Sequence, residues 1–482
     1  MSSEIQRLQE ALDNAQSERE NSVLRATVDL SDTTLVYNDP SPSQSITLPQ
    51  ISTTATQCRT IGNVTLSIAQ VNDLFKIYFA RCHRYLPFTM VTQSPDAMYS
   101  DCPLLFWVIC AVAAHDKLKS QLAPLLKVLL ADTIHSQPRT IATVQALLIM
   151  STWPFSVTAV ADDPSDFYCG IATQMALRLG VHRPTQSHLH TYGSEEHASA
   201  SVVSREVQLT TWMACFIVSQ RNFLFRGVPQ PAWVDDHLLN AFDDFLGDPV
   251  LRLLCRIFHT LMQAYLYVGA KAPTDSGMLA PASRLTAVAS WVDQLAKLEA
   301  KFVDVTNDAV KHAFLTTRMG ILAFCLLDDM PVSEQLLEQV QSAKRHACDL
   351  IELGYGQNLA TAPAHVRNAL SYAGFILIKI LRARLISDAE VLQDQIERVR
   401  QILSTSAPSV DDTYRKASHI MHMLTYVEDK RLSLPIYTRM GASVVFDLLR
   451  ICAEHRSGAF VEAGGTEIDL EGFDWNVWEC LT

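Results

Sequence analysis

The strongest fold signal in this 482-residue chain is the stretch YCGIATQMALRLGVHRP (168–184), followed by REVQLTTWMACFIVSQRNFLFRGVP (205–229). Both segments are long, apolar and of helical character. Ser204 is placed to cap the N-terminus of the second helix, and Gly180 is placed to cap the C-terminus of the first. The pair therefore predicts two long, largely buried helices.

The segments upstream have the same character. VNDLFKIYFARCHRYLPF (71–88) is a first helix that ends at Pro87, because a proline pushes the residue before it out of the α region. One face of this helix is apolar and carries Leu74, Ile77, Tyr78, Cys82 and Tyr85. PLLFWVICAVAA (103–114) is the longest apolar run, and it is far shorter than the roughly 20 residues that a membrane helix needs.

Helical segments also fill most of the C-terminal half. We predict them at Pro249–Ala270, Pro281–Phe302, Ala309–Asp328, Ser333–Leu353, Ala364–Ile386, Asp388–Ser404 and Pro435–Glu454. No strand alternation is sustained, and no internal repeat of fixed period is present. The sequence therefore predicts an all-α protein with a helical body over residues 67–456.

Composition limits the classes of protein that fit. The chain is 48% hydrophobic and 19% charged, so most of it must fold, and its polar N-terminus is not a secretory signal. Most of the eleven cysteines lie in apolar helical segments, which favours a reducing, intracellular compartment. The net charge is −12, and Lys344–Arg345 and Lys430–Arg431 are isolated basic pairs. We therefore expect no direct nucleic-acid binding by this chain alone, and no membrane partner.

An acidic cluster, DDFLGD, is the best candidate for a catalytic metal site. Closely spaced carboxylates can hold Mg²⁺, as in terpene cyclases, and the candidates here are Asp243, Asp244 and Asp248. The second metal motif of such enzymes is absent from the sequence. We therefore interpret the cluster as a solvated acidic loop, and we keep a Mg²⁺-dependent all-α enzyme only as an alternative.

Histidines gather in the polar segment VHRPTQSHLHTYGSEEH. Its members are His182, His188, His190 and His197. Their spacing matches no known zinc site, and no cysteine or rigid helix fixes them, so we interpret the segment as a surface loop. The common catalytic motifs of hydrolases, zinc proteases and nucleotide-binding enzymes are also absent, and we predict neither a bound cofactor nor an enzyme.

The N-terminal 66 residues differ from the helical body. A short coiled coil is predicted in 1–24, where four apolar residues at a and d spacing could support dimerisation: Ile5, Leu8, Leu12 and Ala15. The pattern fails at Arg19, so a surface helix remains the alternative. Residues 25–66 are rich in Ser, Thr and Pro, which predicts a flexible linker.

The C-terminal segment 457–482 interleaves acidic and large apolar residues in EIDLEGFDWNVWECL, with no Lys or Arg after Arg456. The apolar members are Ile468, Leu470, Phe473, Trp475, Val477 and Trp478. Acidic residues keep such a segment solvated while the apolar side chains dock in a partner groove. We interpret it as an acidic activation segment, and the alternative is a tail that packs its tryptophans on the helical body.

The helical segments between 74 and 227 resemble the middle homology region of fungal zinc-cluster transcription factors, and RMGASVVFDLLR (439–450) resembles their C-terminal helix. Positions that match the family motifs are Trp107, Leu179, His182, Arg183, Trp212, Arg221 and Gly227. The resemblance implies an all-α domain that senses effectors or holds the activator silent. In the family, zinc belongs to an N-terminal six-cysteine module that starts C-x2-C-x6-C. Because the first cysteine here is Cys58, we expect that module to be missing from this sequence.

Three functions follow from these observations. The first is the regulatory and activation part of a nuclear transcription regulator that acts on RNA polymerase II genes, with coactivators or the transcription machinery as partners. The second is a partner subunit that dimerises with a full-length zinc-cluster factor through its N-terminal helix. The third is the Mg²⁺-dependent enzyme. The family resemblance and the acidic tail favour the first.

Overall fold

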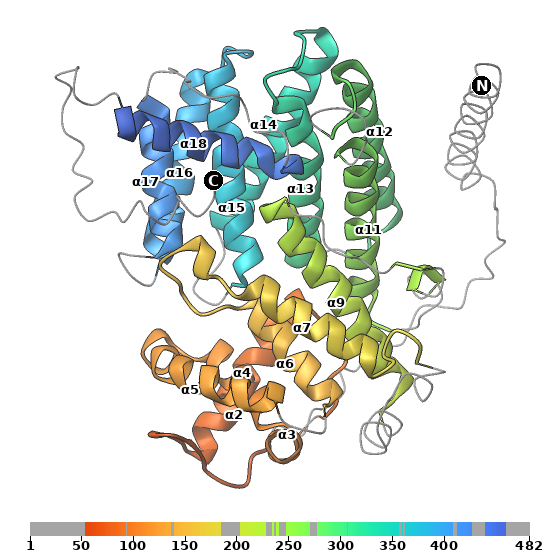
Figure 1. Ribbon diagram of the computed structural model, residues 1–482, viewed down its shortest axis with the longest axis vertical. Coiled ribbons are helices and arrows are strands. Elements are labelled where there is room, and N and C mark those ends of the chain that lie inside the picture. Colours follow the sequence, from red (N-terminus) through yellow and green to blue (C-terminus); the bar gives the residue numbers. More distant parts are fainter. Residues whose placement is uncertain are drawn as a thin grey trace, which may run out of the picture. The chain divides into compact units, whose positions relative to one another are not determined.

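The computed structural model describes residues 54–92, 94–135, 139–184, 203–227, 234–235, 238–240, 247–269, 277–305, 307–355, 359, 362–407, 412–426 and 439–458. Helices make up nearly all of this part of the chain, which confirms the predicted all-α fold (Figure 1). The helices form a first group from residue 68 to 178 and a second group from 249 to 458, and one long helix joins them.

The first group surrounds two helices that are buried on all sides. It consists of α2 (Ile68–Ile77), α3 (Pro95–Asp101), α4 (Pro103–Ala113), α5 (Asp116–His135), α6 (Ile141–Thr152) and α7 (Ser165–Arg178). Every residue of α6 is buried, as is every residue of α4 after Pro103, so neither helix has a polar face. A helix that is apolar all round must be covered by its neighbours, and here α2, α3, α5 and α7 pack around this pair.

The joining helix is α9 (Arg205–Arg226), which packs on α6 and α7 on one side and on α11 and α15 on the other (Figure 1). Its predicted N-cap is confirmed, because Ser204 Oγ accepts a hydrogen bond of 3.3 Å from the amide of Val207. Gly227 ends the helix with a φ of +61°, and a side chain there would run into the carbonyl of Arg439. Glycine is therefore required at this end of α9.

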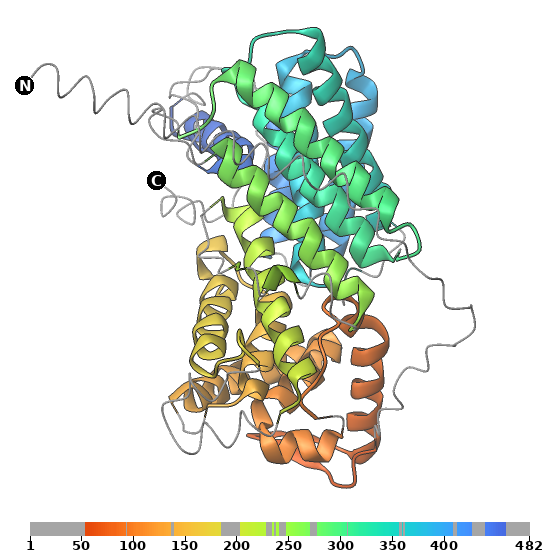
Figure 2. The ribbon, with the colours of Figure 1, turned by 90° about the vertical axis from the view of Figure 1, so that its right-hand side faces the viewer.

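The second group packs as successive neighbours along the chain. It consists of α11 (Pro249–Gly269), α12 (Pro281–Lys301), α13 (Asp308–Leu322), α14 (Glu334–Tyr355), α15 (Ala364–Ala383), α16 (Ala389–Ser406), α17 (Thr413–Tyr426) and α18 (Ser443–Gly458). Figures 1 and 2 show α11 to α16 side by side, and α18 lies across α15 and α17. The boundaries of α11 to α16 lie within three residues of those predicted, except that α13 ends at Leu322, six residues before the predicted end, and a 3-10 turn follows it at Ala323–Leu326. The helix α17 was not predicted.

Buried ion pairs connect the helices of the second group. Lys379 of α15 donates to Asp328 at 2.6 Å and to Asp447 of α18 at 3.3 Å. Arg284 of α12 donates to Asp329, next to Asp328. Lys379 is 6% exposed and Arg284 is fully buried. Each of these two cations therefore has a carboxylate partner that offsets the cost of its burial.

A short hairpin corrects the predicted linker boundary. Residues 25–66 were predicted to be flexible, but β1 (Arg59–Ile61) and β2 (Val64–Leu66) pair antiparallel, with Arg59 opposite Leu66. Gly62 turns the chain with a φ of +55°, and the β1 side chain of Arg59 pairs with Asp96 at 2.7 Å. Gly-Asn between two short β-compatible runs is a hairpin signal, although each run is shorter than a typical strand.

One described helical stretch, Asp308–Leu326, is long and apolar enough by length and composition to cross a membrane. In the fold, 89% of its most apolar window is buried among other helices. The stretch is therefore a core helix, which explains its apolar composition.

Candidate functional site

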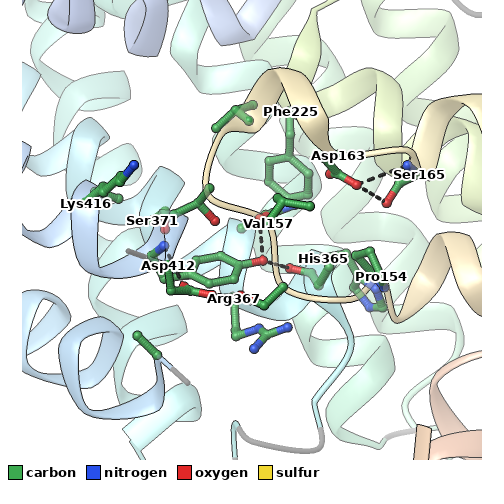
Figure 3. Close-up of a pocket in the computed structure, with 18 of the residues that line it drawn as sticks. Pro154, Val157, Asp163, Ser165, Phe225, His365, Arg367, Ser371, Asp412 and Lys416 are labelled. Atoms are coloured by element: carbon green, nitrogen blue, oxygen red, sulfur yellow. Dashed lines mark hydrogen bonds between the residues drawn. The ribbon is translucent and has the colours of Figure 1, made fainter. Parts of the chain in front are cut away.

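A cavity of about 600 Å³ lies between the two groups of helices. The first group contributes α5, the end of α6 and the segment 154–165, and the second contributes α15, the end of α16, α17 and α18. The joining helix α9 lines it as well. Pockets of this volume hold small organic ligands, so the cavity is the candidate functional site (Figure 3).

The wall that follows α6 is held by a set of hydrogen bonds around Asp163. Ser165 donates to the Asp163 carboxylate from its amide at 3.0 Å and from its hydroxyl at 2.6 Å (Figure 3). Arg226 of α9 pairs with Asp163 at 3.1 Å and with Asp166 at 2.7 Å. These bonds fix the 154–165 segment against α9, and they engage the carboxylate of Asp163 within the wall.

Two hydrogen bonds connect the opposite walls. Ser156 Oγ donates to Asp412 at 2.7 Å, and Lys416 Nζ donates to the carbonyl of Thr158 at 2.8 Å. The Asp412 carboxylate also accepts a bond of 2.9 Å from the amide of Tyr414 at the start of α17. The cavity is therefore a place where the two groups of helices are coupled by side chains.

Apolar side chains cover much of the remaining surface of the cavity. They are Phe155, Val157, Phe225, Phe375, Ile420, Val445, Phe446 and Leu449. Hydroxyl and amide groups lie among them, including those of Ser151, Asn222, Asn368 and Ser371. An apolar surface with a few convergent polar groups is typical of a site for a small metabolite.

Arg221 is the most deeply buried cation of the cavity, and it is 4% exposed. Its Nη2 donates to the carbonyl of Tyr85 at 3.1 Å, and its side chain lies over the ring of Phe258 at 5.5 Å. Its Nε and Nη1 have no hydrogen-bond partner. Burial lowers the pKa of this guanidinium to about 9.

His365 and Tyr414 supply uncharged polar groups. Burial, followed by the positive charges of Arg221 and His312, lowers the pKa of His365 well below its usual value, so this imidazole is neutral at pH 7. Burial raises the pKa of Tyr414, whose hydroxyl donates to Asn368 Oδ1 at 3.0 Å. Both side chains are therefore neutral hydrogen-bonding groups in the cavity wall.

Arg221 is one of the positions that match the family motifs, and it lines the cavity. The other positions lie in packing or capping environments. Trp107 is buried in α4, and Trp212 of α9 lies 5.8 Å from the ring of His182. Leu179 and Gly227 cap helices, and Arg183 pairs with Asp235. A functional role for these positions remains a prediction.

The residues of the predicted metal sites are only partly described. Asp248 accepts hydrogen bonds from the amides of Val250 at 2.7 Å and Leu251 at 3.3 Å, so it caps the N-terminus of α11. Asp243, Asp244, His188, His190 and His197 lie outside the described residues. Within the described ranges, no group of three or more His, Cys, Asp or Glu could hold a metal ion.

The predicted dimerisation and activation residues also lie outside the described residues. They are Ile5, Leu8, Leu12 and Ala15 in the first case, and Ile468, Leu470, Phe473, Trp475, Val477 and Trp478 in the second. Both assignments therefore remain predictions.

Sequence reasoning missed most of the charged residues of the cavity. Lys119, Arg367, Asp412 and Lys416 stand in no motif, and the helix that follows Asp412 was not predicted. Only the fold brings these residues together, because they come from segments that are far apart in the chain. Asp412 has a local signal, since an Asp next to a Thr-Tyr pair before an amphipathic run marks a helix start.

The chain is similar to curated fungal proteins over most of its length. It is 26% identical over 385 residues, 76% of this chain, to a putative transcription factor SEF1 of Kluyveromyces lactis. It is 24% identical over 434 residues, 84% of this chain, to a transcriptional regulatory protein SEF1 of Candida albicans. A shorter match, 28% identical over 34% of this chain, is to a regulatory protein LEU3 of Saccharomyces cerevisiae.

The matches cover only part of these relatives. The chain spans 34% of the Kluyveromyces protein, 47% of the Candida protein and 20% of the Saccharomyces protein. No family model matches the chain, and no solved structure matches it.

Proposed function

Because the chain is a relative of fungal transcription regulators of the zinc-cluster family, we propose that it forms the regulatory part of such a protein and controls transcription by RNA polymerase II. The observation that carries the proposal is the similarity to the SEF1 proteins over 76% and 84% of the chain. The relatives are named for regulation and not for a reaction, so a non-enzymatic role is favoured over a terpene-cyclase-like enzyme. The same comparison supports a nuclear location as part of the proposal.

The proposed regulatory part has two components. The helical body carries the cavity, which is the place where an effector can act, since its two walls belong to different groups of helices. The segment 457–482 is the proposed activation segment, and coactivators or the transcription machinery are its partners. In this proposal the helical body controls access to the segment.

A reporter assay tests the proposal. The full chain and the segment 457–482 are each fused to an unrelated DNA-binding domain. We expect the segment alone to drive the reporter, and to drive it more strongly than the full chain does, because the helical body restrains it. Trp475→Ala and Trp478→Ala should lower the output, since large apolar side chains make the contact with a coactivator.

Asn476→Ala is the matched control, because it changes the same stretch without removing an aromatic side chain. The proposal fails if neither fusion activates or represses the reporter while immunoblots show that both are expressed. Equal output from the full chain and the isolated segment would leave activation intact and would contradict control by the helical body.

A further inference from the structure

The cavity has an excess of positive charge although the chain as a whole has a net charge of −12. Its cationic residues are Lys119, Arg221, Arg226, Arg367 and Lys416, and its acidic residues are Asp116, Asp163 and Asp412. Asp163 is engaged by Arg226 and Ser165, and Asp412 is engaged by Ser156 and the start of α17. The five cationic side chains outnumber the three acidic ones, so the cavity carries an excess of positive charge.

Arg221 is the clearest case of this excess. Other buried cations pair with carboxylates. Lys379 pairs with Asp447, and Arg284 pairs with Asp329. Arg221 has no carboxylate partner in the described part of the chain, and two of its three nitrogen atoms donate to nothing. A buried guanidinium in this state is costly, which is expected where a ligand supplies the missing acceptor.

Arg367 of α15 is a second cation in the cavity wall, half-buried and without a carboxylate partner among the described residues. Its guanidinium lies over the ring of Tyr414 at 4.6 Å, and its Nε has no hydrogen-bond partner. Arg367 and His365, both labelled in Figure 3, lie in the first turn of α15, and the charge of Arg221 contributes to the lowered pKa of His365. Arg221 and Arg367 therefore belong to the same end of the cavity.

Lys119 of α5 is the third. Its pKa is lowered to about 8, first by burial and then by repulsion from Arg367, and Asp116 offsets this only in part. Two cations that repel each other across a cavity wall indicate a position where an anion is stabilised by both. Lys119 comes from the first group of helices and Arg367 from the second, so one anion at this position contacts both groups.

We propose that Lys119, Arg221 and Arg367 bind the charged group of a small organic anion in this cavity. The charged group is a carboxylate or a phosphate, because these fit the forked donors of arginine. The body of the ligand is apolar and lies against the surface formed by Phe225, Phe375 and Phe446. The role of this anion as an effector rests on the proposed function, whereas its binding does not.

Binding is measured on the purified full chain by isothermal titration calorimetry and by the shift of the thermal unfolding temperature. Succinate and hexanoate are the carboxylate probes, and glycerol phosphate and inorganic phosphate are the phosphate probes. We expect one of these two classes to bind and to raise the unfolding temperature. Arg221→Met and Arg367→Met should each weaken that binding by about tenfold or more, since each removes charge-assisted hydrogen bonds.

Lys127→Met is the matched control, because Lys127 is an exposed cation on the same helix as Lys119 and does not line the cavity. Arg367→Lys keeps the charge and the fold while removing the fork, so it should bind more weakly than the wild type and more tightly than Arg367→Met. Circular dichroism checks that each variant is folded.

Absence of binding by every probe, or binding that is equally tight in the wild type, Arg221→Met and Arg367→Met, would overturn the proposal. Binding that is lost equally in Lys127→Met would also overturn it, because this outcome indicates attraction by net charge alone. Reporter activity without anion binding contradicts only this inference, and anion binding without reporter activity contradicts only the proposed function.

Discussion

Lys379 and Arg221 are buried to almost the same extent, at 6% and 4% exposed, yet their surroundings are opposite. Lys379 of α15 contacts two carboxylates, those of Asp328 and Asp447. Arg221 lines the cavity and contacts a carbonyl and an aromatic ring. Burial of a cation alone therefore does not indicate a binding site, whereas burial without a compensating anion does.

The physical reason is the cost of removing a charge from water. Protein carboxylates offset this cost at Lys379, so this lysine is part of the architecture. At Arg221 the cost is offset only by a neutral carbonyl and the face of Phe258. Arg221 therefore lowers the free energy of unfolding of the unliganded protein. Replacing Lys379 should lower this free energy, whereas replacing Arg221 should not.

The largest expected effect comes from Lys379→Met. This change leaves Asp447, whose side chain is 4% exposed, without its ammonium partner. We expect the free energy of unfolding to fall by about 3 kcal/mol, as it does when one member of a buried ion pair is removed. Urea unfolding followed by circular dichroism measures this change.

Lys297→Met is its control, since Lys297 and Asp293 form an exposed pair in α12 with 75% and 60% of their side chains accessible. This variant should change the free energy of unfolding by less than about 1 kcal/mol. An effect of Lys379→Met as small as that of the control would show that the buried triad does not stabilise the fold.

A smaller effect of opposite sign is expected for Arg221→Met. The methionine fills much of the same volume and removes a charge that no carboxylate offsets, so the free energy of unfolding should stay constant or rise by about 1 kcal/mol. The same urea titration measures it. A loss as large as that of Lys379→Met would mean that the protein itself compensates Arg221, and the contrast between the two regions would disappear.

The smallest effect is a pH dependence at Lys119. Its pKa is about 8 in the folded chain and 10.5 in the unfolded chain, so between these values the unfolded state binds more protons. The free energy of unfolding should therefore rise with pH in this window, by about 1 kcal/mol for a partly exposed group. Urea titrations near neutral pH and near pH 10 measure it, with Lys119→Met as the reference.

Relative to Lys119→Met, the wild type should be less stable near neutral pH, and the difference should shrink as the pH rises. Parallel pH profiles of the two proteins would contradict the lowered pKa. A saturating anion should abolish the difference near neutral pH, because it favours the charged form of Lys119.

The helices could be predicted because their signals are local. Apolar periodicity and caps such as Ser204 act within a few residues, and the boundaries of α11 to α16 follow from them. The hairpin at 59–66 was missed because each of its strands has only three residues. Its stability depends on a distant partner, since Arg59 pairs with Asp96.

The cavity could not be predicted, because its walls are built from contacts between distant segments. Ser156 meets Asp412, and Thr158 meets Lys416, with no periodicity that links the two parts of the sequence. Of the predicted positions that the structure describes, only Arg221 lines the cavity, and it was selected by a family motif. The sequence does not reveal that two nitrogen atoms of Arg221 have no hydrogen-bond partner. This feature, which makes Arg221 a candidate ligand-binding residue, is apparent only from the three-dimensional structure.

The bond between Lys416 and Thr158 also has a consequence for the order of folding. These residues are 258 positions apart, and a ribosome adds about 5 to 20 residues per second, so roughly 10 to 50 s pass between the synthesis of the two. The first group of helices can fold during this interval, whereas the opposite wall of the cavity does not yet exist. The cavity is therefore completed late, and only a chain translated past α18, which also lines the cavity, can form the whole binding site.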